Sequence, residues 1–461
     1  MDRKATSELV HWLTSSRRKP IIIRGARQVG KSTLVRMLAE STGRRVITIN
    51  LERHAGLDSV FSTLDLGKII PALESLPGSG RIADEDILFL DEIQATPHAL
   101  AALRYFYEER PQLAVVAAGS LLEFVLADHD FAMPVGRVRY LHLHPMDFAE
   151  FLAAVGESVL LDRLRTFTLQ GGIDSVTHAR LHELFTVYSF VGGMPEAVAT
   201  WVETRSPIAV REVHTGLIDT YRADFAKYGL RQDMPNLHQL FDRAARAIGQ
   251  KVKYSALLAD EQSRSVRRLL NLLLAARLFY AVHHADCQGM PLRAGIDDRI
   301  YKLLMIDVGL FNAVRRFEWS HARGELEESI AHQGALAEQL VGQELLASGI
   351  AGSGDELVYW LREGRSNNAE VDYVIAANGK SVPIEVKSGK TGSLKSLFVF
   401  AETHRSSRVV RFDLGLPSLQ STAHAAAKDK NKTVTVELLS LPIYAAGQLG
   451  RILGGSWADR R

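Results

Sequence analysis

Short apolar runs alternate with longer helical stretches over the first third of the chain. Ile21 to Ile23, "RVITINLER" (45–53), "DILFLDEIQ" (86–94), "QLAVVAAGS" (112–120) and "RVRYLHLHPMDFAEFL" (137–152) each supply a strand. Strands that alternate with helices form a parallel sheet covered on both faces. The pattern therefore predicts an α/β domain over residues 20–150, preceded by an N-terminal helix over residues 1–19.

A Gly-rich loop joins the first of these strands to a helix. In "KPIIIRGARQVGKSTLVRMLAE" the spacing Gly25-x-x-x-x-Gly30-Lys31-Ser32 fits a phosphate-binding loop. Its backbone N–H groups would close around phosphate oxygens, and the following helix would point its positive end at them. Lys31 is expected to reach the β- and γ-phosphates, and Ser32 to ligate Mg²⁺. The alternative is a glycine-rich turn that happens to contain Lys-Ser. The expected nucleotide-binding residues are Gly25, Ala26, Arg27, Gln28, Val29, Gly30, Lys31, Ser32 and Thr33.

Two acids end the strand in "DILFLDEIQ". Asp91 would hold Mg²⁺ through water, and Glu92 would orient and deprotonate the attacking water. Ser120, at the end of the strand in "QLAVVAAGS", would sense the γ-phosphate; the alternative is a helix cap.

These residues resemble a family. "GARQVGKST", "LFLDEIQ", "AAGSLLEF", "GRVRYLHLHPMDFAEFL" and "SFVGGMPEAV" are similar to the AAA-type ATP-binding proteins of bacteria and archaea, which carry a C-terminal domain of unknown function with a nuclease-like fold. The resemblance covers nearly the whole chain. It implies an oligomeric ATPase in which an arginine of one subunit completes its neighbour's site. Arg137 is the candidate and Arg139 the alternative, while a surface or structural role is open for both.

The middle of the chain is predicted as two helical segments. Residues 151–245 read as a helical lid with breaks at "LQGGIDS" and "VGGMPEA", and residues 246–322 read as three helices and a strand, which suits a winged helix. In the third helix, Arg264, Arg267 and Arg268 share one face that could enter a DNA groove. The alternative is a solvated basic face on a packing helix.

The chain's last third contains a predicted hairpin, "EVDYVIAANGKSVPIEVKSG" (370–389). Asn378-Gly379 favours a two-residue type I′ turn. That turn would place Asp372 across from Glu385 and Glu370 across from Lys387, with all four side chains on one face. Like charges placed opposite each other destabilise a sheet by up to about 1 kcal/mol, whereas a divalent cation between them removes the repulsion. Val371 and Tyr373 would form an apolar opposite face.

The arrangement resembles the restriction-endonuclease-like (PD-D/E-x-K) nucleases, although Val371 stands where a proline often precedes the first acid. By that resemblance Asp372 and Glu385 would ligate Mg²⁺, Lys387 would be catalytic, and Glu338, on a predicted amphipathic helix, would assist the metal site. Two alternatives remain open: a surface hairpin with mixed charges, and a nuclease-like fold that binds without cutting. Lys390 and Lys395 are further candidates for nucleic-acid contact.

Composition adds little about partners. A formal net charge of +2 neither supports nor excludes nucleic acid. The single cysteine, Cys287, excludes an internal disulfide and fits a reducing compartment. The N-terminus lacks the apolar core of a signal peptide, and no apolar run reaches about 18 residues. We therefore expect a cytoplasmic protein without membrane segments.

Together the patterns predict a multidomain α/β protein: an AAA-type P-loop core, a helical lid, a winged-helix-like segment, a nuclease-like domain over residues 323–445 and a tail over residues 446–461. The expected function is ATP-hydrolysing nucleic-acid processing by a homo-oligomer that uses ATP and Mg²⁺, with DNA as the expected partner and DNA cleavage left open. The alternative is a nucleotide-controlled switch in stress or defence signalling.

Overall fold

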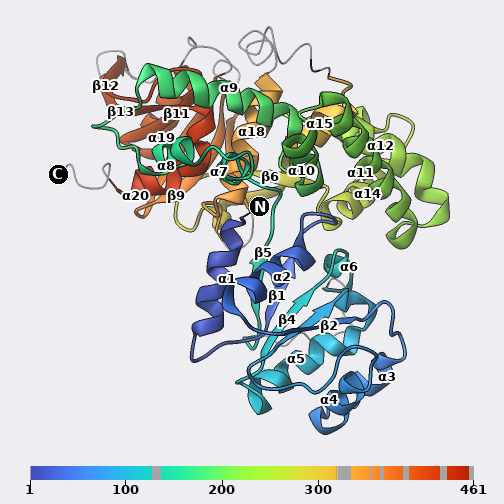
Figure 1. The fold of residues 1–461 in the computed structure, drawn as a ribbon. Helices are drawn as coiled ribbons and strands as arrows, with labels where there is room; N and C mark the ends of the chain where they lie inside the picture. Colours follow the sequence, from blue (N-terminus) through green and yellow to red (C-terminus); the bar gives the residue numbers. More distant parts are fainter. Residues whose placement is uncertain are drawn as a thin grey trace. The chain divides into compact units, whose positions relative to one another are not determined.

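The structure, a computed structural model, describes residues 2–126, 136–317, 319, 334–352, 356–363, 368–387, 394–425 and 433–455. The chain divides into two compact units (Figure 1). The first contains residues 1–144 and 275–278, and the second contains residues 145–274 and 279–461. No helix in the described part of the chain is long and apolar enough to cross a membrane.

The first unit is built on a five-stranded parallel sheet with the order β2-β3-β4-β1-β5. Its strands are β1 (Ile21–Arg24), β2 (Val46–Asn50), β3 (Ile87–Asp91), β4 (Ala114–Ala118) and β5 (Arg139–His142). The helices that accompany them are α1 (Lys4–Thr14), α2 (Lys31–Thr42), α3 (Leu57–Phe61), α4 (Leu66–Glu74), α5 (Pro97–Glu109) and α6 (Leu122–Leu126). The predicted parallel α/β fold is confirmed.

The sheet brings three chemically active segments to one edge. β4 is buried along its whole length, and β1 and β3 are buried up to their last residue, as a parallel sheet covered on both faces requires. Because these strands are parallel neighbours, the loops after Arg24, Asp91 and Ala118 leave the sheet at the same edge. Ligands of open α/β sheets bind at this carboxyl edge.

The second unit begins with helices, and the two predicted breaks are confirmed. The helices are α7 (Phe148–Ala154), α8 (Ser158–Thr166), α9 (Ser175–Val191), α10 (Pro195–Thr204), α11 (Pro207–Tyr228), α12 (Met234–Arg246), α13 (Tyr254–Leu257) and α14 (Ser263–Ala275). The gaps between α8 and α9 and between α9 and α10 fall at "LQGGIDS" and "VGGMPEA".

An eight-stranded sheet follows, with the order β12-β13-β11-β10-β9-β8-β6-β7 (Figure 1). Its strands are β6 (Phe279–Ala285), β7 (Ile296–Met305), β8 (Val358–Arg362), β9 (Ala369–Ala377), β10 (Lys380–Val386), β11 (Arg408–Asp413), β12 (Ser418–Ala425) and β13 (Thr433–Pro442). β6 pairs with β7 and also with β8. The strands after the three helices α12 to α14 therefore extend the sheet that contains the hairpin, and the winged-helix assignment stays a prediction.

The helix α18 (Gly334–Ala347) is buried on all sides, so the predicted amphipathic helix is wrong. Its polar side chains are satisfied by neighbouring elements rather than by water. The amide of Gln339 bonds to both backbone groups of Met305, and the Gln343 and Glu344 side chains bond to the Tyr188 hydroxyl. Buried polar residues thus replaced the solvent-facing side that the sequence pattern suggested.

The remaining described helices are α15 (Val308–Val314), α19 (Lys395–His404) and α20 (Leu449–Gly454). α20 falls in the segment predicted as a tail. Its Leu449, Ile452 and Leu453 side chains are buried, and Arg451 bonds to the carbonyl of Phe167, so this part of the predicted tail packs against the unit.

Candidate functional site

The phosphate-loop backbone of the first unit requires glycine at defined positions. Gly25 and Gly30 have φ values of 148° and 96°, and Gln28 has a φ of 65°. A Cβ atom at Gly25 would lie 2.4 Å from the carbonyl oxygen of Leu143. A side chain at this position would therefore clash with backbone as well as strain φ.

Lys31 lies folded against the loop in the position predicted for a phosphate-binding lysine. Its Nζ donates hydrogen bonds to the carbonyls of Gly25 (3.0 Å) and Ala26 (2.7 Å). Burial lowers the pKa of Lys31 to about 8, although Glu92 and Asp91 oppose this shift. Phosphate oxygens could replace both carbonyl acceptors and compensate the buried charge.

The predicted magnesium pair is assembled. The hydroxyl of Ser32 donates to Asp91 Oδ2 at 3.1 Å. Burial, followed by repulsion from Glu92, raises the pKa of Asp91. A divalent cation at this pair would favour the charged carboxylate, and the hard oxygen donors suit Mg²⁺.

Glu92 and Ser120 also converge, together with a residue that the sequence reasoning did not single out. Gln94 Nε2 donates to Glu92 Oε2 at 2.6 Å, and the Ser120 hydroxyl lies 3.5 Å from the same oxygen. Glu92 has a φ of 53°, a left-handed conformation that is strained for a non-glycine residue. Gln94 stands in the same "LDEIQ" stretch, and its proximity to Glu92 was the available signal.

Arg137 and Arg139 lie at the opposite end of the sheet from the phosphate loop. β5 pairs with β1 in parallel so that Arg139 stands beside Ile21, the first residue of β1, whereas the loop follows the last. Arg137 donates to Glu108 at 3.0 Å, and Arg139 forms an ion pair with Glu8. Neither arginine is placed to complete the nucleotide site of its own subunit.

In the second unit, the predicted hairpin turn and register are confirmed. Asn378 and Gly379 have φ values of 51° and 72°, as a type I′ turn requires. The pairs run from Lys380–Ala377 to Ile384–Tyr373. The next step in this register is the predicted Asp372–Glu385 position.

The alternation of faces is interrupted within β9. A register shift against β8 lies next to Asp372, and both Val371 and Val374 pack in one apolar cluster with residues of α19. The Tyr373 hydroxyl instead donates to the carbonyl of Glu338 in α18 at 2.8 Å. Tyr373 therefore does not share an apolar face with Val371, because a bulge carries two successive residues past one partner position.

Lys302 of β7 joins the acidic residues, and the sequence gave no signal for it. Its Nζ lies 2.8 Å from Glu338 Oε1 and 3.8 Å from Asp372 Oδ1, and it forms an ion pair with Glu370. Burial acts to lower the pKa of Lys302, but attraction to Glu338, Asp372 and Glu370 outweighs it and raises the pKa. The predicted Glu370–Lys387 pair is not formed, because Glu370 turns to Lys302.

Glu385 and Lys387 form the other half of this acidic cluster, which we define as Glu338, Glu370, Asp372 and Glu385. Lys387 pairs with Glu385 Oε1. Glu385 Oε2 is buried and has no hydrogen-bond partner among the described residues. Burial and repulsion from Asp372 raise the pKa of Glu385 to about 8. Asp372 Oδ2 accepts a bond from the N–H of Val386 at 2.8 Å, which orients its carboxylate beside Glu385.

The three predicted metal ligands do not form a ready-made set. Within the described residues, no three Asp, Glu, His or Cys side chains converge with metal-site geometry. Glu338 is held by Lys302, and burial raises its pKa to about 7. Only Asp372 and Glu385 remain close to the open, buried oxygen.

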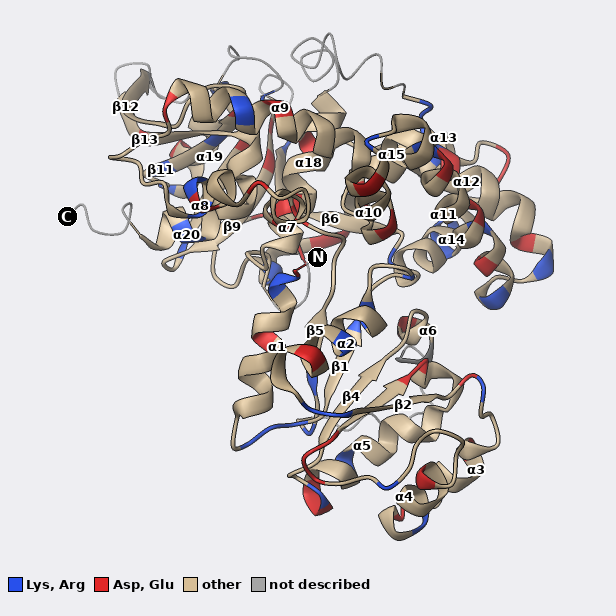
Figure 2. Cartoon of the chain, viewed as in Figure 1, with Lys and Arg blue, Asp and Glu red and all other residues tan. Residues whose placement is uncertain are grey.

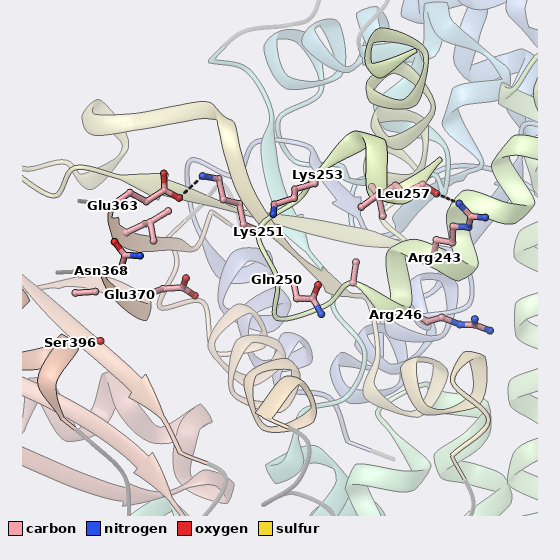
Figure 3. Close-up of a pocket in the computed structure, with 14 residues that line it drawn as sticks. Arg243, Arg246, Gln250, Lys251, Lys253, Leu257, Glu363, Asn368, Glu370 and Ser396 are labelled. Atoms are coloured by element: carbon pink, nitrogen blue, oxygen red, sulfur yellow. Dashed lines mark hydrogen bonds and ion pairs between the residues drawn. The ribbon is translucent and has the colours of Figure 1, made fainter. Parts of the chain in front are cut away.

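A basic pocket of about 720 Å³ lies next to this cluster (Figure 3). We call it the α12 pocket and define it by Arg243 and Arg246 of α12, by Lys251 and Lys253, and by Glu363 and Glu370. Glu370 belongs both to the pocket lining and to the acidic cluster. None of the four basic residues was singled out from the sequence, since they are spread over α12 and the loop that follows it.

The basic residues that the sequence did predict have mixed outcomes. Arg264, Arg267 and Arg268 are exposed on α14, but Arg268 forms two hydrogen bonds with Asp233, at 2.8 and 2.7 Å. Figure 2 shows Lys and Arg interspersed with Asp and Glu over α11 to α14. Lys395 is exposed at the start of α19, beside Ser396 of the pocket lining, and Lys390 lies outside the described residues.

Three family models match successive parts of the chain. Residues 17–152 match an AAA domain, residues 182–321 match the domain of unknown function DUF8612, and residues 333–438 match the domain of unknown function DUF4143. Comparison with curated protein sequences gives no match.

Among solved structures, the chain is similar to the Walker-type ATPase PABY2304 of Pyrococcus abyssi, with 18% identity, 68% of this chain and 95% of that chain covered, and a TM-score of 0.43. It is also similar to the Holliday junction branch migration motor RuvB of Thermotoga maritima, with 14% identity, 61% and 89% covered, and a TM-score of 0.30. AMPPCP-bound DnaA from Aquifex aeolicus matches with 11% identity, 59% and 87% covered, and a TM-score of 0.26. With the phosphate loop, the acid pair and the strand order in place, residues 17–152 are an AAA-type ATPase domain, joined in one chain to two domains of unknown function.

Proposed function

We propose that the protein is an ATP-hydrolysing enzyme that processes nucleic acid, with ATP turned over in the first unit and a strand handled in the second. In the first unit, Lys31 would bind the β- and γ-phosphates, and Ser32 with Asp91 would hold Mg²⁺. Glu92, steadied by Gln94, would orient and deprotonate the attacking water. Ser120 would contact the γ-phosphate from the next strand.

One observation carries the nucleic-acid part of the proposal: the buried, partnerless oxygen of Glu385 beside Asp372 and Lys387. A buried carboxyl oxygen without a partner is unfavourable, and a cation bound there would satisfy it. Asp372 and Glu385 are the residues that would hold Mg²⁺. When bound, the ion would polarise a phosphodiester and lower the pKa of a water molecule.

The chain's own side chains have defined tasks in this proposal. Lys387 would bind a non-bridging phosphate oxygen and offset the negative charge that develops during hydrolysis. The N–H of Val386 would fix the orientation of the Asp372 carboxylate. Lys302 would neutralise Glu338 and Glu370, which leaves Asp372 and Glu385 for the metal.

The test is cleavage of labelled single-stranded and branched DNA in Mg²⁺ by wild type, Glu385→Gln and Lys387→Ala. Glu203→Gln, at an exposed position on α10, is the matched control. We expect product from wild type and the control, and at least 100-fold less from the two cluster variants. Equal cleavage by all four proteins would assign the activity to a contaminant or another site.

Lys302 also favours a second candidate, a nucleotide-controlled switch whose second unit recognises nucleic acid without cutting it. An ammonium between Glu338, Glu370 and Asp372 already supplies positive charge that a metal would otherwise bring. ATP turnover separates the two candidates. A processing enzyme would hydrolyse ATP several-fold faster with DNA, and Glu92→Gln would trap it on DNA. A switch would hydrolyse slowly and equally with and without DNA.

The proposed assembly is a homo-oligomer. Because Arg137 lies away from its own phosphate loop, it would act on the γ-phosphate of a neighbouring subunit, and Arg139 is the alternative.

A further inference from the structure

The α12 pocket concentrates positive charge in a concave site. Its lining has four basic and two acidic side chains, which gives a net charge of +2. Its volume of about 720 Å³ lies within the range of small-molecule and cofactor sites. A double helix is too wide for such a cavity, whereas a few linked nucleotides of one strand fit.

Most of this positive charge is not compensated within the pocket. Lys251 pairs with Glu363 at 2.8 Å, and Arg243 donates to the carbonyl of Leu257 at 3.0 Å, which leaves its charge unopposed (Figure 3). Burial, followed by repulsion from Arg246, lowers the pKa of Arg315. Positive groups therefore crowd one end of the pocket without an acid between them, which favours an anionic ligand.

The other end of the pocket leads to the acidic cluster. Figure 3 shows Glu370 on the side of Glu363 and Asn368, with Gln250 between it and the arginines of α12. The Glu370 carboxylate also contacts Lys302, which in turn holds Glu338 and Asp372. A polyanion bound along the pocket would thus reach the cluster through Glu370.

We propose that the α12 pocket binds the phosphodiester backbone of a single nucleic-acid strand and leads it to the acidic cluster, an inference that rests on the proposed function. The lining, which consists of described residues only, contains no aromatic side chain on which a base could stack. Binding is therefore electrostatic and independent of base sequence. DNA and RNA share this backbone chemistry, and each is tested.

The experiment measures fluorescence anisotropy of labelled 20-residue oligonucleotides with the full chain in EDTA at several salt concentrations. The probes are oligo-dT, mixed-sequence DNA and oligo-U. The pocket variant is Arg246→Gln/Lys253→Gln, whose two side chains are exposed. Arg243 is left intact because it holds the carbonyl of Leu257. The charge-matched control is Arg163→Gln/Arg165→Gln, at exposed positions on α8.

We expect the pocket variant to bind all sequences about 10-fold more weakly than wild type, and its logarithmic salt slope to be flatter by about 1.4, that is about 0.7 for each lost phosphate contact on a single strand. The control variant should match wild type. Glu363→Gln should bind more tightly, because it releases Lys251. Unchanged affinity and slope in the pocket variant would overturn the proposal, as would a loss confined to one base sequence.

A second pair of variants tells whether the pocket or the exposed face of α14 binds the strand. Arg264→Gln/Arg267→Gln removes two charges from α14. A loss of affinity in this variant alone would overturn the proposal in favour of α14. Glu385→Gln in EDTA should bind like wild type. Pocket-dependent binding without cleavage in Mg²⁺ would leave this inference standing while refuting the cleavage assignment, whereas cleavage with an inert pocket would do the reverse.

Discussion

Lys302 keeps several carboxylates of the second unit close together. The side chain of Lys302 is 2% exposed, and it contacts Glu338, Glu370 and Asp372. It also lies 5.2 Å from the centre of the Tyr359 ring, which is a favourable position for a cation. Removing one partner of a buried ion pair leaves the others without compensation, which is more harmful than replacing the whole group.

Lys302→Met should therefore lower the free energy of unfolding by about 3 kcal/mol. Urea denaturation followed by circular dichroism measures this loss. Lys387→Met, which removes a less buried lysine with one carboxylate partner, should lose about 1 kcal/mol or less. Mg²⁺ should stabilise Lys302→Met more than wild type, because the freed carboxylates gain a cation. Equal losses for the two variants, with no effect of Mg²⁺, would refute this role of Lys302.

Residues that act through local spacing could be predicted, and residues that act through the fold could not. Gly25 to Thr33 and Asp91–Glu92 form contiguous motifs, so their positions beside one another followed from a strand, a loop and a helix. Lys302 reaches the cluster only because β7 joins the sheet through β6 and β8 and packs against α18. Nothing in "RIYKLLMID" distinguishes this lysine from a surface residue.

Among the elements, turns were better predicted than faces. The Asn378-Gly379 turn was correct because both positions need positive φ, a local requirement. The face of Tyr373 and the exposure of α18 were wrong because both depend on neighbours distant in sequence. α18 buries Gln339, Gln343 and Glu344 among partners from β7, α9 and other elements, which no periodicity reveals.

Contact between α9 and α11 gives the second unit a predicted pH dependence. His214 of α11 donates from Nε2 to the carbonyl of Val191 at the end of α9, at 2.9 Å. Burial lowers the pKa of His214 to about 4, against about 6.5 in an unfolded chain. The unfolded state therefore binds a proton first as pH falls, and stability is lost below pH 6.5 by about 1.4 kcal/mol per pH unit.

We expect His214→Gln, which retains a hydrogen-bond donor, to reduce this dependence. Between pH 7.5 and pH 5.0 wild type should lose about 2 kcal/mol more than the variant, measured by urea denaturation. Burial raises the pKa of the nearby Asp307 to about 6, and this group titrates in both proteins, so the comparison isolates His214. Parallel pH profiles would show that His214 has no role in the loss.

At the scale of the whole molecule, the ATPase fold could be predicted from sequence, whereas the number of separate bodies could not. The lid, winged-helix-like and nuclease-like segments were predicted separately, yet all lie in one compact unit. The reason is that β6 and β7 add to the hairpin's sheet, and α18 bonds to α9 and β7. Sequence patterns locate elements, but they do not tell which sheet a strand completes.

The assembly prediction rests on the parallel register of β1 and β5. Since Arg137 lies at the sheet end opposite its own phosphate loop, Arg137→Ala should retain ATP binding and lose most ATP turnover. Glu92→Gln should also be inactive, because it lacks the residue that orients water. The two defects lie on different surfaces of a head-to-tail interface.

Mixing the two inactive variants therefore tests the assembly directly. In a randomly mixed oligomer, about a quarter of the interfaces would join an intact Glu92 site to an intact Arg137, so about a quarter of wild-type turnover should return. Steady-state phosphate release from pre-mixed subunits measures this recovery. Arg139→Ala mixed with Glu92→Gln is the matched comparison, and recovery there together with an active Arg137→Ala would assign the role to Arg139. A mixture that stays inactive while the single variants bind ATP would show that no arginine at this end of the sheet acts on a neighbour.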